Sequence, residues 1–116
     1  MLFKRKEGKE NIVEIPCNTK EFRRIIEENK VVVVDFWAKW CFPCIIYARS
    51  FKKAASKLAG KALFAKVNVG ECYSLVRKYN IFGVPTTMIF VNGKPKRRIL
   101  GLVSDKDLVR LVEEYL

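Results

Sequence analysis

The sequence contains no histidine and no glutamine, whereas lysine, arginine and glutamate are abundant. A zinc site usually needs histidines or a second close cysteine pair, and this chain offers only one such pair among its four cysteines. We therefore do not expect the cysteines to hold a metal. The lack of glutamine and histidine beside abundant lysine, arginine and glutamate also suggests a thermophilic source.

Long hydrophobic runs are also missing. Half of the 116 residues are apolar, yet no run approaches the length that spans a bilayer. The start, MLFKRKEGKENIV, is charged throughout and lacks the apolar core and cleavage site of a secretory signal. There is no repeat, low-complexity tract or interdomain linker. We expect a mobile charged arm over residues 1–10, one domain over residues 11–116, and a cytoplasmic protein without a membrane association.

The charge is unbalanced, with 23 Lys+Arg against 12 Asp+Glu and a formal net charge of +11. Such a charge speeds encounters with nucleic acid or acidic proteins. Most basic residues alternate with acids, as in KEFRRIIEENK, and only KPKRRIL is denser. This pattern is typical of a solvated surface and predicts no specific nucleic-acid site. The alternative is a basic binding module for acidic partners. Binding to such partners that persists in the Cys41→Ser variant would support this alternative.

Hydrophobic periodicity predicts nine elements in the order β-α-β-α-β-α-β-β-α. In chain order they cover residues 11–16, 18–30, 31–38, 42–59, 62–69, 72–81, the two arms of a hairpin over 86–102, and 104–116. Asn18 or Thr19 should cap the first helix, Ser104 the last, and the hairpin should turn at Asn92-Gly93. The order predicts an α/β fold with a central mixed sheet of about five strands and four helices on both faces.

Two of these helices have apolar positions at helical spacing, which we expect to face the core. In the first helix they are Phe22, Ile25 and Ile26, and in the long helix they are Ile45, Ile46, Phe51, Ala55 and Leu58.

The stretch VVVVDFWAKWCFPC, residues 31–44, combines an apolar strand with a lone acid, Asp35, and two cysteines. An ionised carboxylate in such a strand is costly unless it is paired or neutralised, so we expect the pKa of Asp35 to be raised. A buried carboxyl of this kind exchanges protons near neutral pH.

Cys41 follows the strand and opens a long helix, where unpaired backbone N–H groups and the helix dipole favour a thiolate. Cys44 falls one turn later on the same face, within reach of a disulfide, and Pro43 suits an early helical position. We expect Cys41 to attack a substrate disulfide and Cys44 to resolve the mixed disulfide, with Asp35 accepting its proton. An inert structural disulfide is the alternative.

These residues carry a resemblance. VDFWAKWCFPC resembles the thioredoxin signature, usually V-D-F-W-A-x-W-C-G-P-C, and the similarity continues through AKVNV and YNIFGVPTTMIFVNGK to LGLVS. It covers roughly residues 12–116. The resemblance implies a thioredoxin fold and a protein-disulfide reductase without a bound cofactor. It also implies that Lys66 approaches Asp35 and tunes its charge.

The resemblance further implies a substrate-binding surface beside the cysteines. Its expected residues are Trp40, Phe42, Pro43, Val84, Pro85 and Gly101. Pro85 would be a cis proline, and with Val84 it would pair with the substrate chain as an added strand. Trp40 would pack beside the dithiol, and Gly101 would keep the docking groove open.

The sequence departs from the family pattern near the cysteines. Phe42 replaces the common glycine, which could enlarge the docking surface and shift the redox potential. Ile45 stands where a lysine is frequent, and Gly70 where an aspartate is common. These changes leave the dithiol chemistry intact.

The direction of reaction is expected to be reductive, because Phe-Pro offers no cation to stabilise the thiolate. The resemblance implies that electrons come from a separate reductase, typically a flavoprotein that draws on a nicotinamide cofactor. We expect the protein to act as a monomer on disulfide-containing proteins. A thioredoxin-fold oxidase or isomerase is the alternative. A potential of roughly −270 mV or lower favours a reductase, and one of roughly −120 to −180 mV favours the alternative.

Cys17 and Cys72 follow the first and third predicted strands, which are adjacent and parallel in this fold. Both cysteines therefore belong at one edge of the sheet. They are either small buried hydrophobic residues or a second disulfide, of a kind that occurs inside hyperthermophiles.

Overall fold

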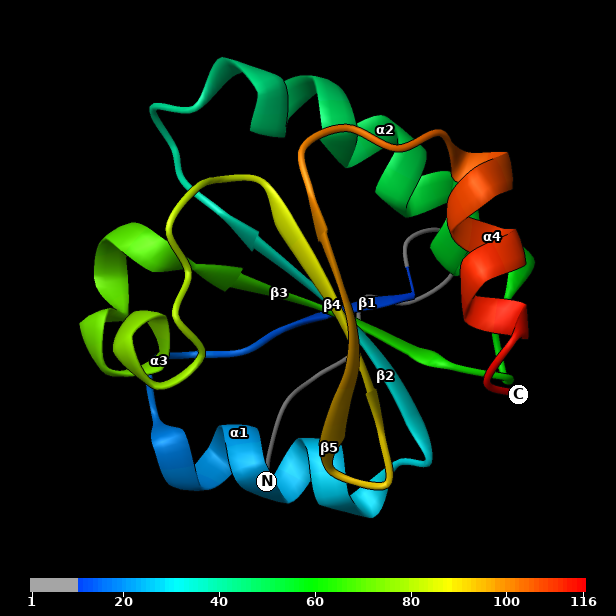
Figure 1. Cartoon of the computed structure of the whole chain (residues 1–116), viewed down its shortest axis with the longest axis horizontal. Helices are drawn as coiled ribbons and strands as arrows, with labels where there is room; N and C mark the ends of the chain where they lie inside the picture. Colours follow the sequence, from blue (N-terminus) through cyan, green and yellow to red (C-terminus); the bar gives the residue numbers. More distant parts are fainter. Residues whose placement is uncertain (1–10) are drawn as a thin grey trace.

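The computed structural model describes residues 11–116, so the arm expected over residues 1–10 lies outside the described part. Its elements follow the predicted order with one added 3-10 turn, η1 (Figure 1). They are β1 (Ile12–Glu14), α1 (Thr19–Glu28), β2 (Val31–Trp37), α2 (Phe42–Lys57), β3 (Leu63–Asn68), η1 (Val69–Glu71), α3 (Tyr73–Lys78), β4 (Thr86–Val91), β5 (Lys94–Leu100) and α4 (Asp105–Glu113). None of the helices described is long and apolar enough to cross a membrane.

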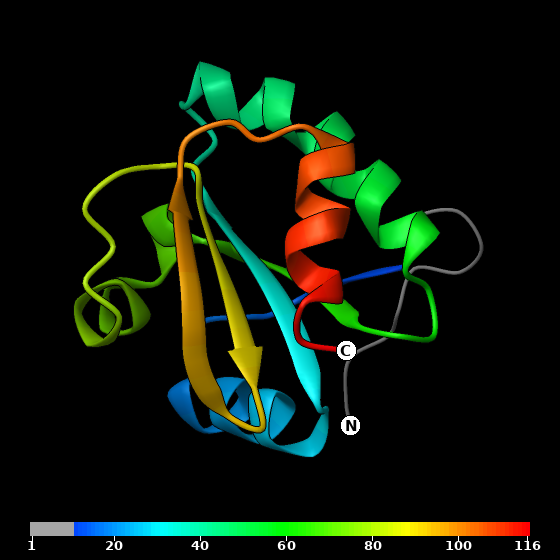
Figure 2. The same ribbon diagram turned by 45° about the vertical axis from the view of Figure 1, so that its right-hand side comes forward.

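One mixed sheet organises these elements, with strand order β1-β3-β2-β4-β5. Strands β1, β2 and β3 run parallel, and the β4–β5 hairpin adds two antiparallel strands. Helices α1 and α3 cover one face and α2 and α4 the other, an arrangement seen in both views (Figures 1 and 2). The predicted five-stranded α/β fold is confirmed.

The central strand β2 divides its side chains between two cores. Val32, Val34 and Phe36 pack with residues of α1 and α3, while Val31 and Val33 pack with residues of α2 and α4. Because side chains alternate along a strand, Asp35 points to the face that α2 covers. This face carries Cys44 as well, so the sheet places the buried acid beneath the helix that holds the cysteines.

Helix α2 corrects one prediction. Ile45 and Ile46 were expected to face inward, but their exposed fractions are 60% and 50%. The buried stripe of α2 consists of Cys44, Tyr47, Phe51, Ala54 and Ala55. These positions recur every three or four residues, and the two isoleucines fall between them on the helix surface. Phe51, Ala55 and Leu58 are buried as predicted.

Local signals in the sequence set the turns and helix ends. Asn92 and Gly93 both have positive φ, 52° and 84°, which is the backbone that a two-residue hairpin turn of type I′ requires. Ser104 caps α4 by accepting a hydrogen bond from the Asp107 N–H. Both predictions are confirmed.

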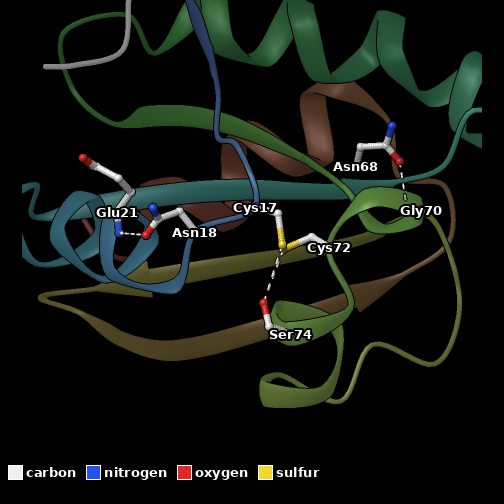
Figure 3. Close-up of a disulfide and its surroundings, with 7 residues drawn as sticks. All are labelled: Cys17, Asn18, Glu21, Asn68, Gly70, Cys72 and Ser74. Carbon is white, nitrogen blue, oxygen red and sulfur yellow. Dashed lines mark hydrogen bonds between the residues drawn. A yellow bond between two sulfur atoms is a disulfide. The ribbon is translucent and has the colours of Figure 1, made fainter.

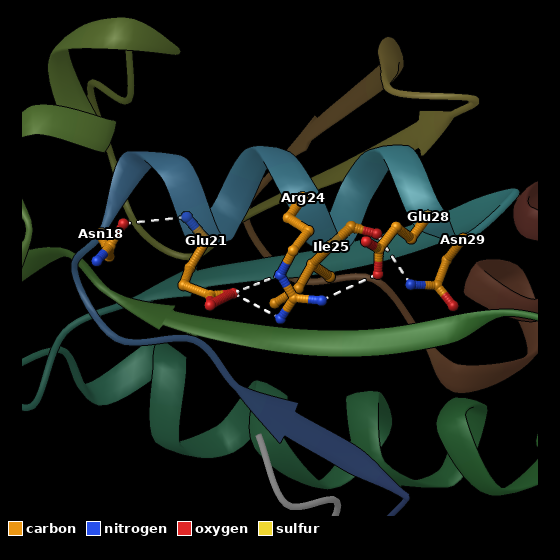
Figure 4. Close-up of polar contacts among 6 residues, drawn as sticks. All are labelled: Asn18, Glu21, Arg24, Ile25, Glu28 and Asn29. Carbon is orange, nitrogen blue, oxygen red and sulfur yellow. Dashed lines mark hydrogen bonds and ion pairs between the residues drawn. The ribbon is translucent and has the colours of Figure 1, made fainter. Parts of the chain in front are cut away.

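Helix α1 shows the same agreement, with Phe22, Ile25 and Ile26 buried as predicted. Asn18 is its N-cap and accepts from the Glu21 N–H (Figure 4). Arg24 bridges Glu21 and Glu28 along the exposed face, and the Asn29 side chain donates to a carbonyl of the last turn. Such exposed ion pairs contribute little to stability.

Candidate active site

Cys41 and Cys44 form a disulfide at the start of α2, with their Cα atoms 5.2 Å apart. Cys41 is the N-cap residue, and the Cys44 N–H donates to its sulfur at 3.2 Å. The Cys41 sulfur also lies 3.6 Å from the Val84 carbonyl oxygen. A backbone N–H at a helix N-terminus stabilises negative charge, so after reduction Cys41 is the better placed of the two to carry a thiolate.

The dipeptide between the cysteines belongs to the first turn of α2. Pro43 is its second residue, where the helix has no internal partner for an N–H, so the proline loses no hydrogen bond. Phe42 is 69% exposed and lies at the helix mouth. The first turn of α2 therefore sets the distance between Cys41 and Cys44 that allows the disulfide to form.

Asp35 is completely buried in the middle of the sheet. Its register partners are Lys66 in β3 and Thr87 in β4. Within residues 11–116 neither carboxylate oxygen has a hydrogen-bond partner. Burial raises the pKa of Asp35 to about 7, although the positive charge of Lys66 lowers it in part. The carboxyl group can therefore take up or release a proton near neutral pH.

Lys66 is half-buried on the neighbouring strand. Its ammonium nitrogen lies 4.8 Å from the ring centroid of Trp37, a cation–π contact that keeps the charge at the margin of the sheet. From there it acts on Asp35 through space.

Tyr47 and Thr87 are neighbours of Asp35 that sequence reasoning missed. Their hydroxyl groups share a buried hydrogen bond of 2.7 Å. Burial raises the pKa of Tyr47, the bond to Thr87 lowers it, and the charge of Asp35 raises it further. The two hydroxyls bond to each other, and neither bonds to the carboxylate. The available signal was that Tyr47 follows Cys44 by three residues, on the same face of the helix.

The chain segment opposite the cysteines is the turn before β4. The Val84–Pro85 peptide bond is cis, as predicted. Gly101 has a φ of +92°, and its N–H donates to the Pro85 carbonyl at 2.8 Å. Gly101 thus ties the end of β5 to Pro85, the residue after the valine whose carbonyl lies near the Cys41 sulfur.

This geometry can be compared with known proteins. The family model described as Thioredoxin matches residues 13–114. The chain belongs to the thioredoxin family. Thioredoxin from Mycoplasma pneumoniae is 39% identical over 95 residues, 82% of this chain and 92% of that protein. Thioredoxin 1 from Plasmodium falciparum is 38% identical over 104 residues, 90% of this chain and 98% of that protein.

Solved structures agree with this assignment. A mutant thioredoxin from Halobacterium salinarum NRC-1 superimposes with a TM-score of 0.82 at 29% identity, covering 95% of this chain and 96% of that chain. Thioredoxins are protein-disulfide oxidoreductases that act on disulfide substrates and are themselves reduced by a reductase. This chain is an oxidoreductase of that class.

An apolar groove of about 600 Å³ opens beside the Cys41–Cys44 disulfide. Residues 40–43 at the start of α2 line it together with a second set of residues in and around α3, which we call the α3 wall. The α3 wall consists of Val69, Tyr73, Val76, Ile81, Phe82, Gly83 and Val84. Sequence reasoning placed four of these residues in the binding surface, together with Cys41 as the nucleophile, but missed the wall around α3. Trp40, Tyr73 and Phe82 are 77%, 71% and 93% exposed, which is unusual for such large apolar side chains.

Pro85 and Gly101 do not line this groove. Pro85 is buried, and the Gly101 N–H donates to its carbonyl oxygen. The cis bond at Pro85 is confirmed, whereas the expectation that Gly101 keeps the docking groove open stays a prediction. The exposed wall at Tyr73 and Phe82 had no local signal beyond isolated aromatic residues.

The remaining two cysteines also form a disulfide, Cys17–Cys72, with Cα atoms 4.9 Å apart (Figure 3). Strands β1 and β3 are parallel neighbours, so the loops that follow them meet at the same edge of the sheet. Of the two alternatives that the sequence left open, the structure has the disulfide. No group of three or more potential ligands within residues 11–116 is arranged to hold a metal ion.

Proposed function

We propose that this thioredoxin is a protein-disulfide reductase that works through its Cys-Phe-Pro-Cys site. The observation that carries the proposal is the position of Asp35. This carboxyl group, with a pKa of about 7 and no hydrogen-bond partner among the described residues, lies beneath the helix that begins with Cys41 and Cys44. A structural disulfide would give no reason to bury an unpaired acid at that point.

The reaction begins when the Cys41 thiolate attacks one sulfur of a substrate disulfide. A Cys41–substrate bond forms, the substrate disulfide breaks, and its second sulfur leaves with the electron pair and takes a proton. Cys44 then attacks the Cys41 sulfur, and the substrate sulfur that was bound to Cys41 leaves as a thiolate. Two electrons pass to the substrate, and Cys41–Cys44 is left oxidised as in the structure.

Asp35 acts in the second step. Cys44 is buried and must lose its proton before it can attack, and Asp35 is the acid–base group nearest to neutrality beneath it. We assign Asp35 the role of proton acceptor. Lys66 keeps the pKa of Asp35 from rising further, so that the carboxylate form is present at working pH.

Substrate docks in the apolar groove beside Cys41. Trp40, Phe42 and Pro43 contact it from one side and Val84 from the other, while the backbone before β4 pairs with the substrate as an added strand. Pro85 and Gly101 support this segment. The groove favours extended segments with a large apolar side chain next to the disulfide.

The direction that we propose is reductive, since neither Phe42 nor Pro43 supplies a positive charge that would stabilise the reduced thiolate. The electron donor is a separate reductase of the flavoprotein type, and the protein acts as a monomer in the cytoplasm. The second disulfide supports a thermophilic source, because intracellular disulfides are common in hyperthermophiles.

Turnover of insulin disulfides with dithiothreitol as the electron donor tests this function. We expect the wild type to be active and Cys41→Ser and Cys44→Ser to be inactive. Cys41→Ser removes the attacking sulfur, and Cys44→Ser accumulates the mixed disulfide. An inactive wild type with binding to acidic proteins would instead support a basic binding module.

A further inference from the structure

We propose that Cys17–Cys72 is a second thiol–disulfide exchange site, in which an incoming thiolate attacks the Cys17 sulfur and Cys72 leaves, and that its reduction releases the α3 wall of the substrate groove.

The two sulfurs differ in their access to solvent. Cys17 lies in the exposed loop between β1 and α1, whereas Cys72 is 1% exposed and belongs to the core cluster of α1 and α3. A macromolecular thiol can approach only the Cys17 side of the bond. Exchange rates depend on which sulfur is accessible, so the attacked sulfur is Cys17 and the leaving sulfur is Cys72.

A polar group is present for the leaving sulfur. The Ser74 hydroxyl lies 3.5 Å from the Cys17 sulfur and 3.8 Å from the Cys72 sulfur (Figure 3). A disulfide sulfur carries no hydrogen, so the hydroxyl is the donor in both contacts. The same hydroxyl can donate to Cys72 as negative charge develops on it, which a purely apolar pocket could not do.

The bond also controls one wall of the groove. Cys72 joins η1 to α3, and the first residue of each element, Val69 and Tyr73, lines the groove. Helix α3 has only six residues, and Cys72 at its N-cap makes no side-chain capping bond. Within the described residues this disulfide is the one covalent link from the wall to the loop before α1. Reduction leaves the wall held by packing and by hydrogen bonds, such as those from the Ile81 N–H to the Val76 carbonyl and from the Thr86 hydroxyl to the Gly83 carbonyl.

The exchange balances with a dithiol as the reductant. Its first thiolate forms a bond to Cys17, the Cys17–Cys72 bond breaks, and the electron pair goes to the Cys72 sulfur, which takes a proton. The second thiol then attacks the first donor sulfur, which yields the oxidised donor and the Cys17 thiol. The reduced Cys41–Cys44 dithiol of a second copy is a donor of this class, a point that rests on the proposed function.

Trapping of the mixed disulfide tests the site. The acceptor is the Cys41→Ser/Cys44→Ser protein, which keeps Cys17–Cys72, and the donor is the reduced Cys17→Ser/Cys44→Ser/Cys72→Ser protein, which keeps only Cys41. We expect a covalent heterodimer whose peptide map shows a Cys41–Cys17 link. A link to Cys72 overturns the proposal. So does the lack of a complex when the same donor traps insulin, a control that establishes separately whether Cys41 is an active nucleophile.

A second measurement tests the effect on the groove, with circular dichroism to show that both proteins are folded. In the Cys17→Ser/Cys72→Ser protein we expect KM for insulin to rise about fivefold, the effect of having to order one more loosened side chain on binding. The rate with a small aromatic disulfide, which does not need the α3 wall, should be unchanged. Equal KM values for insulin in this variant and the wild type would overturn the claim that the Cys17–Cys72 disulfide holds the α3 wall.

Discussion

Asp35 and Lys66 are register partners on adjacent parallel strands, yet the ammonium group of Lys66 lies over the Trp37 ring and neither carboxylate oxygen of Asp35 accepts a hydrogen bond from residues 11–116. The lysine therefore lowers the pKa of Asp35 by less than burial raises it. This balance sets the carboxyl pKa at about 7, where it is useful for proton transfer.

Asp35 should make stability depend on pH. The pKa is about 7 in the folded protein and 3.8 in its ordinary state, so between these values the folded protein binds a proton that the unfolded chain has lost. The protonated Asp35 therefore stabilises the folded protein. This stabilisation is complete below about pH 4 and is lost as pH rises through 7. The expected decrease in the free energy of unfolding is on the order of 4 kcal/mol.

Urea unfolding of the oxidised protein at pH 5 and pH 8 measures the larger part of this decrease, on the order of 3 kcal/mol. We expect Asp35→Asn to remove most of the decrease and to be more stable than the wild type at pH 8. Asp107→Asn, at an exposed position of α4, is the matched control and should leave the pH dependence in place. A wild type that is equally stable at both pH values would contradict the raised pKa.

Lys66→Met should raise the pKa of Asp35 further, because it removes the positive charge that lowers this pKa. The pH above which insulin turnover reaches its plateau should move upward with it. The pH–rate profile and a carboxyl titration by NMR measure the two effects. Lys61→Met, on the exposed turn after α2, is the control, and an equal shift in both variants would speak against a local action of Lys66.

Tyr47→Phe should destabilise the protein by about 1–3 kcal/mol, because it leaves the buried Thr87 hydroxyl without its partner. Thr87→Val in the same chain removes the orphaned hydroxyl and should restore part of the loss. A double-mutant cycle by denaturant unfolding gives the coupling. Additive losses would show that the two hydroxyls do not depend on each other.

Cys17→Ser/Cys72→Ser should lower the free energy of unfolding by about 2–4 kcal/mol, since the disulfide closes a long loop in the unfolded chain. The two cysteines are separated by 55 positions. Thermal unfolding under oxidising conditions measures the loss, and the reduced wild type should unfold at a temperature close to that of the reduced variant. A persistent difference after reduction would assign the effect to the serines.

The redox potential of Cys41–Cys44 separates a reductase from an oxidase or isomerase. We expect a value of roughly −270 mV or lower against a glutathione or dithiothreitol buffer, measured on the Cys17→Ser/Cys72→Ser protein so that one couple titrates. A value of roughly −120 to −180 mV would identify the alternative activity. The reason for the low value is the absence of a cation in the Phe42-Pro43 dipeptide.

The features that the sequence predicted well depend on neighbouring residues. Asn92-Gly93 specifies its turn because only such residues accept two positive φ angles, and Ser104 caps the helix that begins beside it. Cys41 and Cys44 meet because they are one helical turn apart. The raised pKa of Asp35 was also predictable from neighbouring residues, since the strand around it is apolar.

Only the tertiary structure decided how distant segments meet. The exposure of Ile45 and Ile46 depends on which stripe of α2 the sheet covers, and apolar composition alone does not reveal it. The bond between Tyr47 and Thr87, the choice of a disulfide for Cys17, and the α3 wall of the groove all join residues far apart in the chain. The sequence by itself determined the local backbone and the order of elements, whereas these contacts follow from strand register and helix packing, which only the folded sheet sets.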